Sequence, residues 1–213
     1  GGMSRLRYNR REAVAWLRAQ CPAMDRFIAR CGPLELRVAK DADLFRALSA
    51  AIIYQQLSGK AAATIHGRFC GLFPDSRPEP QRLAGLPTES LRGAGLSNNK
   101  ALAVRDLAEK TLDGSLPAGR RMARMDDRAV IEALCTVRGV GPWTAQMYLI
   151  FNLGRPDVMP ATDLGVQKGV QYAYGLDTLP SPDDVLRQTR QLIPYRSAAA
   201  WYFWLAADTG LVA

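Results

Sequence analysis

Residues 134–143, with the sequence LCTVRGVGPW, decide the fold of this chain. An apolar helix end runs into the turn Gly139-Val140-Gly141, and Pro142 suits the first turn of a helix that begins directly after it. Glycines permit a positive φ and remove Cβ atoms from the surface of the turn, so a phosphate oxygen could approach the backbone. The first N–H groups of the next helix would face that phosphate. The stretch predicts a helix-hairpin-helix; a tight hairpin without a ligand is the alternative.

Outward from the hairpin, helix signals continue through almost the whole chain. Ser, Asp and Asn stand where helices would begin, and Gly or Pro where they would end. The expected helices span about 9–20, 22–31, 43 to a break at 58–59 with Gln56 on the buried face, 60–72, 81–84, 89–92, 98–112, 127–136, 142–153, 164–174, 182–192 and 198–208. Only residues 34–38 alternate like a strand, and they are too isolated to build a sheet. The predicted fold class is therefore all-α.

The domain organisation follows from the same signals. We expect one domain in residues 4–213, made of two lobes at about 40–115 and 125–208, with the N-terminal helices packed on the second lobe. Residues 114–124 are basic and contain Gly and Pro, which predicts the linker between the lobes. Residues 1–3 are typical of a tag-cleavage remnant followed by the start Met.

Composition and charge exclude several classes of protein. With 48% hydrophobic and 23% charged residues, the chain has the composition of a globular protein. Its apolar runs are shorter than the roughly 18 to 20 residues that cross a membrane, and its start lacks the features of a signal peptide, so we expect no membrane partner and an intracellular location. The net charge of +8 favours a polyanionic partner, nucleic acid first, with solvated helix faces as the alternative.

The four cysteines carry no metal or disulfide signal. Cys21, Cys31, Cys70 and Cys135 lie far apart and none belongs to a CxxC pair. We therefore expect reduced thiols and no metal bound by cysteine.

A carboxylate follows the hairpin at a suggestive spacing. Asp163 lies twenty residues after Trp143, in the segment MPATDLGV at 159–166. A helix over 142–153 would be about 18 Å long, and the loop through Pro160 could return the chain toward the hairpin. The carboxylate could then face a nucleotide held there. Its ordinary role, the N-cap of the next helix, is compatible with a catalytic one.

Together these residues resemble the helix-hairpin-helix DNA glycosylase superfamily, most closely its alkylpurine branch, the 3-methyladenine DNA glycosylase II family. The hairpin turn and Asp163 match the hairpin and the catalytic Asp of that family. Three further segments support the resemblance, which extends over about residues 40–208: AIIYQQLS at 51–58, GLSNNKA at 95–101, and PYRS at 194–197 followed by Trp201 and Trp204. The resemblance implies a two-lobed helical fold with the active site in the cleft between the lobes.

Three differences from other members of the superfamily define more closely which of its members the chain resembles. Trp143 occupies the position of the Lys with which bifunctional members form a Schiff base, which implies base excision without a lyase step. The four closely spaced C-terminal cysteines of the iron-sulfur branch are absent. The region before residue 40 is too short for the N-terminal β domain of longer relatives, so the chain resembles the minimal form.

The resemblance also implies roles for individual residues. A glycosylase must flip the damaged nucleotide out of the duplex, fill the gap with a wedge, and hold a cationic base among aromatic rings beside an anion. Asp163 would be the catalytic carboxylate. The base pocket would hold Tyr54, Trp143, Met147, Trp204 and Trp201, and the wedge would be Gln55, Gln56 and Leu57. The DNA backbone would contact Gly139, Val140, Gly141, Thr144, Lys100, Lys168 and Arg196, and the carbonyls of Cys135, Val137 and Val140 could hold a monovalent Na⁺ or K⁺.

The expected activity is hydrolysis of the N-glycosidic bond of alkylated purines such as 3-methyladenine and 7-methylguanine, in base excision repair. The expected partner is double-stranded DNA containing alkylated bases, bound by a monomer that requires no cofactor and contains no iron-sulfur cluster. The location would be cytoplasmic, at the nucleoid in a bacterium, or otherwise intracellular. Three alternatives stay open: a glycosylase of the same fold for another damaged or mismatched base, a non-catalytic DNA-binding module, and a scaffold or interaction protein that uses the helical surface. Ordinary structural roles also stay open, namely a helix end capped by Gln55 and Gln56 and a core position for Trp201.

Overall fold

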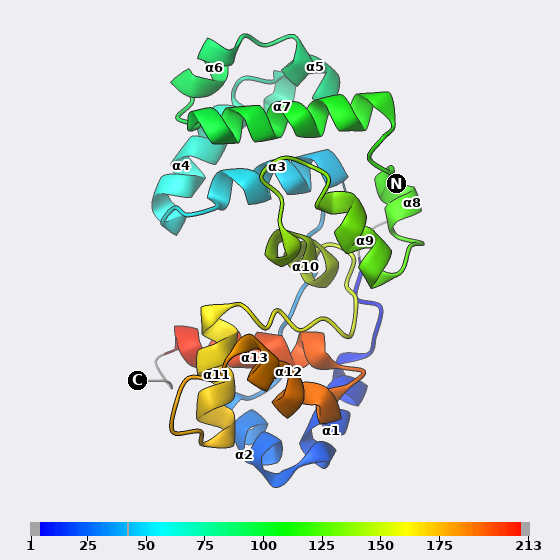
Figure 1. Ribbon diagram of the computed structural model, residues 1–213, viewed down its shortest axis with the longest axis vertical. Helices are drawn as coiled ribbons and strands as arrows, with labels where there is room; N and C mark the ends of the chain where they lie inside the picture. Colours follow the sequence, from blue (N-terminus) through cyan, green and yellow to red (C-terminus); the bar gives the residue numbers. More distant parts are fainter. Residues whose placement is uncertain (1–4, 42, 210–213) are drawn as a thin grey trace. The chain divides into compact units, whose positions relative to one another are not determined.

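The computed structural model describes residues 5–41 and 43–209, and within them every regular element is a helix (Figure 1). This confirms the all-α prediction for the described residues. Residues 1–3, interpreted as a tag remnant and start Met, lie outside them. The chain divides into two compact units, one at Lys40–Tyr148 and one formed by the described parts of Ser4–Ala39 and Leu149–Ala213. None of the helices in the described ranges is long and apolar enough to span a bilayer.

The first unit is built around one long helix. Its helices are α3 (Leu44–Tyr54), α4 (Gly59–Cys70), α5 (Pro80–Ala84), α6 (Thr88–Gly93), α7 (Asn98–Asp113), α8 (Gly119–Met122), α9 (Asp127–Leu134) and the start of α10 (Pro142–Phe151), with a 3₁₀ turn at Pro74–Ser76. Helix α7 packs against α3, α5 and α6 (Figure 1). Leu48 and Ile52 of α3 and Val104 and Leu107 of α7 are buried, as their helical spacing predicts.

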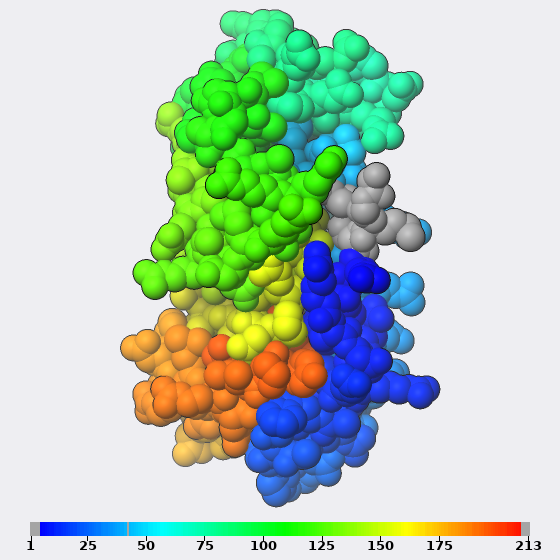
Figure 2. All heavy atoms as spheres, turned by 90° about the vertical axis from the view of Figure 1, so that its right-hand side faces the viewer, coloured from blue at the N-terminus to red at the C-terminus, as the bar shows by residue number. Residues whose placement is uncertain are grey.

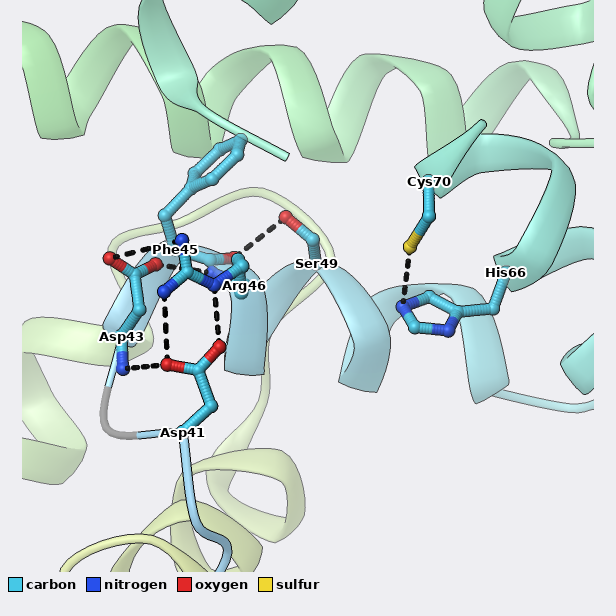
Figure 3. A network of polar contacts seen from close by, with 7 residues as sticks. All are labelled: Asp41, Asp43, Phe45, Arg46, Ser49, His66 and Cys70. Atoms are coloured by element: carbon cyan, nitrogen blue, oxygen red, sulfur yellow. Dashed lines mark hydrogen bonds and ion pairs between the residues drawn. The ribbon is translucent and has the colours of Figure 1, made fainter. Parts of the chain in front are cut away.

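The beginning of α3 is fixed by a network of polar contacts (Figure 3). Asp43 Oδ1 accepts a hydrogen bond from the backbone N–H of Arg46 at 2.8 Å and so caps the helix. The Arg46 guanidinium in turn donates to both carboxylate oxygens of Asp41, at 2.5 and 3.0 Å. These hydrogen bonds lower the pKa of Asp41 from its ordinary value. The network therefore holds the chain at the point where it enters the first unit.

The other caps follow the sequence closely. At six further helix starts, a side-chain oxygen accepts a backbone N–H that the helix leaves without a partner. The capping residues are Asn9, Ser58, Ser97, Asp126, Asp163 and Ser181. Gly114 ends α7, and Gly175 ends α11 (Leu164–Tyr174), both in the left-handed conformation that favours glycine.

The second unit joins the two ends of the chain. Its helices are α1 (Arg10–Gln20), α2 (Pro22–Cys31), the end of α10, α11 (Leu164–Tyr174), α12 (Pro182–Thr189) and α13 (Arg196–Asp208), with a 3₁₀ turn at Arg190–Leu192. Helices α11 and α13 pack against each other, and α2 packs against both. In Figure 2 the N-terminal segment, in blue, accordingly lies beside the C-terminal helices, in orange.

The division between the units differs from the predicted lobes. Residues 114–124, predicted as the linker, lie within the first unit and contain α8. Leu116 and Met122 in this segment are buried and attach it to the unit, although most of its other residues are exposed. The division instead falls inside α10, between Tyr148 and Leu149. The hairpin before α10 stays with the first unit because it is hydrogen-bonded to Gln55 and to Asp106 of α7. Cap and turn signals mark where helices end but carry no information about which helices pack together.

Two further expectations need correction. Helix α3 ends at Tyr54, so Gln56 does not continue its face; the backbone of Gln56 adopts a φ of 58°, which leaves the helix. The last helix begins at Arg196 rather than Ala198.

The four cysteines are free, and all four are half-buried.

Candidate active site

The hairpin connects α9 to α10 through a turn with two glycines, of which only one adopts a backbone conformation that favours glycine. Gly139 has a φ of 79°, and a Cβ built on it would lie 3.1 Å from the Cβ of Ala103 in α7. Gly141 lacks a positive φ, and a Cβ there would meet no atom within 4 Å. The conformational argument for glycine therefore holds at Gly139, whereas Gly141 leaves a bare and open stretch of backbone at the start of α10.

The turn is fixed by a buried side chain and by a hydrogen bond to α7. Val140 is buried, and the Arg138 N–H donates to Oδ2 of Asp106 in α7 at 2.8 Å. The other carboxylate oxygen of Asp106 accepts from Lys110 Nζ at 2.6 Å. Burial acts to raise the pKa of Asp106, but the hydrogen bonds from Lys110 and Arg138 outweigh it and hold that pKa below its ordinary value. Asp106 thus anchors the hairpin to α7, a role that the sequence did not reveal.

A short loop between α3 and α4, residues 55–58, reaches the hairpin; we call it the tip loop. The Gln55 side chain donates from Nε2 to the carbonyl of Gly139 at 3.0 Å and to Oγ1 of the buried Thr144 at 3.2 Å. Gln56 and Leu57 are exposed. Of the three predicted wedge residues, Gln55 is therefore bound to the hairpin, and Gln56 and Leu57 are the two that project into solvent.

Lys100 lies beside the same loop. Its ammonium donates to the carbonyl of Ile53 at 2.7 Å and to the carbonyl of Gln55 at 2.6 Å. Burial lowers the pKa of Lys100. The predicted phosphate contact of this lysine stays a prediction, since two of its three N–H groups already have protein partners.

The first unit also presents aromatic rings. Trp143, at the start of α10, and Tyr54, at the end of α3, are each 42% exposed although both are large rings. Met147 follows Trp143 by one helical turn and is half-buried. The ring of Tyr54 packs edge-on against His66 with centroids 5.8 Å apart, and burial lowers the pKa of His66. His66 Nε2 also lies 3.6 Å from Cys70 Sγ (Figure 3).

Asp163 belongs to the second unit, where it caps α11. Its Oδ1 accepts the backbone N–H of Val166 at 3.0 Å and the indole N–H of Trp204 at 2.8 Å. The Trp204 ring in turn packs against Phe151, with centroids 5.7 Å apart. The carboxylate is thus oriented by two N–H donors, at a helix N-terminus where a negative charge is favoured.

Two glycines of α11 allow this contact. A Cβ on Gly165 would lie 3.0 Å from Cδ1 of Trp204 and 3.1 Å from Oδ1 of Asp163. A Cβ on Gly169, one turn later, would lie 2.4 to 2.6 Å from Cβ, Cα and the carbonyl oxygen of Phe203. Helix α13 therefore passes α11 at a distance that only glycine permits, and this places the indole on the carboxylate.

The remaining predicted residues lie in the same unit. Arg196 forms a two-point ion pair with Asp157, with N–O distances of 2.8 and 3.0 Å. Lys168 is exposed on α11. Trp201 is half-buried and packs edge-on against Tyr202. Their assigned roles stay predictions.

Each unit therefore brings together part of the predicted site. The first holds the hairpin, the tip loop, Lys100 and the ring-bearing positions Tyr54 and Trp143; the second holds Asp163 and Trp204. The sequence prediction missed Asp106, Gly165 and Gly169. The spacing of the two glycines, four residues apart on a helix, is the signal that could have indicated a close helix contact.

No group of three or more His, Cys, Asp or Glu side chains within residues 5–41 and 43–209 could hold a metal ion.

The chain is similar to known proteins over most of its length. Residues 49–195 match the family model described as HhH-GPD superfamily base excision DNA repair protein. DNA-3-methyladenine glycosylase 1 of Schizosaccharomyces pombe is 36% identical over 161 residues, covering 75% of this chain and 71% of that protein. An alkylbase DNA glycosidase-like protein of the same yeast is 31% identical, covering 83% and 84%. A solved structure of an S. pombe 3-methyladenine DNA glycosylase with abasic DNA superposes with a TM-score of 0.84 at 32% identity, covering 92% of this chain and 97% of that one.

Proposed function

Because the chain belongs to the HhH-GPD superfamily of base excision DNA repair proteins, we propose that it is a monofunctional DNA glycosylase that excises alkylated purines, with Asp163 as its catalytic carboxylate. The observation that carries the catalytic assignment is the geometry of Asp163, whose Oδ1 is held by a helix N-terminus and by the indole N–H of Trp204.

Excision of an alkylated purine requires little more from the active site than a negative charge held in a fixed position. Alkylation at N3 or N7 leaves a purine cationic and its glycosidic bond weakened, so the departing base needs little protonation. The sugar develops positive charge as the bond breaks, and a preorganised anion stabilises that charge. Asp163 is the anion, and it also orients or deprotonates the attacking water. Its two N–H donors keep the carboxylate in one orientation without reorganisation during the reaction.

Aromatic rings recognise the extruded cationic base. A cation above a ring face gains about 0.5 to 2 kcal/mol, more when it is desolvated. We assign this purpose to the exposed rings of Trp143 and Tyr54 in the first unit, together with Met147. In the second unit we assign it to the rings of Trp204 and Trp201. Trp204 then has two functions, a ring face for the base and an N–H for Asp163.

The hairpin binds the DNA backbone, and the tip loop inserts into the duplex. The N–H groups of Gly139, Gly141 and Thr144 receive a phosphate, favoured by the bare backbone at Gly141. Val140 shapes the turn at this site, because its N–H donates to the carbonyl of Val137 at 3.1 Å. Gln56 or Leu57 fills the gap that the flipped nucleotide leaves, offsetting part of the unstacking cost of a few kcal/mol. The exposed Lys168 adds positive charge along the bound strand, and Arg196 would contact the strand while its charge is balanced by Asp157.

The hairpin carbonyls of Cys135, Val137 and Val140 could hold a monovalent cation. The Arg138 N–H donates to Asp106, whereas the carbonyl of Val137 accepts the N–H of Val140 at 3.1 Å and would bind the cation through its second lone pair. A bound Na⁺ or K⁺ would add positive charge beside the phosphate. No cofactor is otherwise required. The enzyme acts as a monomer on double-stranded DNA containing alkylated bases, inside the cell and, in a bacterium, at the nucleoid.

Base release from methylated DNA tests the proposal. The purified protein is incubated with defined duplexes carrying 3-methyladenine, 7-methylguanine, 1-methyladenine, ethenoadenine, 8-oxoguanine or a mismatch, and free bases are separated and quantified. We expect release of alkylated purines and an abasic strand that breaks only after alkali, because Trp143 supplies no amine. Release of only the oxidised or mismatched base would contradict the substrate assignment, and release of no base would overturn the enzymatic one.

A further inference from the structure

The position of Lys100 is the most informative feature that the proposed function leaves unexplained. Lys100 lies in the first turn of α7, where its own N–H is bound by the cap Ser97. Its side chain does not extend into solvent but reaches the end of α3, where the ammonium bonds the carbonyls of Ile53 and Gln55. These two atoms belong to residues 47 and 45 positions earlier in the chain.

The end of α3 needs such a partner. The last carbonyls of a helix have no N–H groups from a following turn, and the negative end of the helix dipole lies there. Directly afterwards the backbone turns into a left-handed conformation at Gln56, a residue that is not glycine. A positive charge that binds the carbonyls on either side of Tyr54 therefore determines where the helix stops and in which direction the tip loop leaves it.

Gln55 carries this constraint to the hairpin. Its backbone carbonyl is bound by Lys100, while its side-chain amide is bound to Gly139 and Thr144. The chain Lys100–Gln55–Gly139 thus connects α7, the tip loop and the phosphate-binding turn by hydrogen bonds of 2.6 and 3.0 Å. All of these residues lie in the first unit.

We propose that Lys100 is a positioning residue that acts through Gln55, setting the tip loop against the hairpin so that the wedge enters the duplex in register with the bound phosphate. Lys100 on this account does not neutralise a DNA phosphate itself. The inference rests on the proposed function, because a register between wedge and phosphate matters only to a protein that extrudes a nucleotide.

Salt dependence separates the two roles of the lysine. A side chain that neutralises a phosphate contributes about one unit to the slope of log affinity against log salt. We therefore expect Lys100→Met to leave this slope unchanged for duplex DNA. The same variant should lower single-turnover base release at saturating enzyme by about 10- to 100-fold, because a displaced wedge misplaces the reacting nucleotide. Lys40→Met, which removes an equal charge from an exposed lysine of the same unit, is the matched control for rate.

Insertion of the wedge is measured directly. A 2-aminopurine placed beside an abasic analogue reports unstacking through its fluorescence. The signal of the wild-type complex should fall in Lys100→Met and be retained in Lys40→Met, with all assays run well below the midpoint of thermal unfolding of each variant. A variant that is folded and binds DNA but gives no insertion signal is the expected result.

A double-mutant cycle tests whether Lys100 works through Gln55. Gln55→Leu removes the amide that binds the hairpin, and if the two residues form one network, the double variant should lose little more than the worse single variant. Rate losses that multiply would overturn the inference, as would a salt slope reduced by about one with normal base release in Lys100→Met. These outcomes differ from failure of the proposed function, which would leave the wild-type protein without base release.

Discussion

At Asp163 a helix cap and a candidate catalyst are the same side chain. Its position before an apolar helix predicts the cap from local sequence alone, and the structure shows that cap. Its second donor, Trp204, lies 41 residues later, and no local pattern pairs the two. The candidate residues could therefore be named from the sequence, whereas the contact that orients the carboxylate depends on how α11 and α13 pack.

Gly165→Ala tests that contact. The new methyl would lie 3.0 Å from Trp204 and 3.1 Å from Asp163, so the indole or the carboxylate must shift by a few tenths of an ångström and their hydrogen bond is disturbed. We expect single-turnover base release to fall by about tenfold or more. Gly67→Ala in α4, where a Cβ meets nothing within 4 Å, is the matched helical control and should keep full activity. Equal rates for both variants would argue against a role of the indole contact.

Trp204→Phe separates the N–H of the indole from its ring. Phenylalanine keeps an aromatic face but cannot donate to Asp163 Oδ1. A hydrogen bond to a charged group contributes about 1.5 to 3 kcal/mol, so we expect base release to slow by roughly 10- to 100-fold. Product quantification under single-turnover conditions measures this, and a wild-type rate would mean that the ring alone is used.

At the scale of the element, helix ends were predictable and helix partners were not. Caps such as Ser97 and Asp126 depend on residues three positions apart, which the sequence displays directly. Helix α8 was missed because residues 114–124 contain the Gly and Pro of a loop, although the burial of Leu116 and Met122 packs the segment into the unit. The hydrogen bonds from Gln55 to Gly139 and Thr144 join residues that are 84 and 89 positions apart. No local sequence pattern in either segment predicts them.

The contact between α11 and α13 yields a prediction for stability. In Gly169→Ala the added methyl would lie within 2.4 to 2.6 Å of Phe203 atoms that include its backbone, so the helices must separate. Such overpacking costs about 1 to 3 kcal/mol of the free energy of unfolding. Thermal unfolding should show a midpoint below that of the wild type, whereas Gly67→Ala should match or exceed the wild type because alanine favours a helix. An unshifted midpoint in Gly169→Ala would show that α13 can move without cost.

For the whole molecule, the net charge of +8 predicts the mode of DNA binding. If about six phosphates are neutralised, affinity should fall by roughly a thousandfold between about 50 and 200 mM salt. Fluorescence anisotropy with an undamaged duplex measures the slope. Affinity that does not change with salt would contradict a phosphate-binding surface and would favour the explanation in which the excess charge only solvates helix faces.

Asp163→Asn gives the most direct test of the central claim, because asparagine keeps an oxygen that can accept the N–H groups of Val166 and Trp204 while losing the charge. Single-turnover release of 7-methylguanine from a defined duplex should fall by about 100-fold or more, with affinity for DNA containing an abasic analogue retained. An Asp163→Asn protein that releases the base at the wild-type rate would contradict the account.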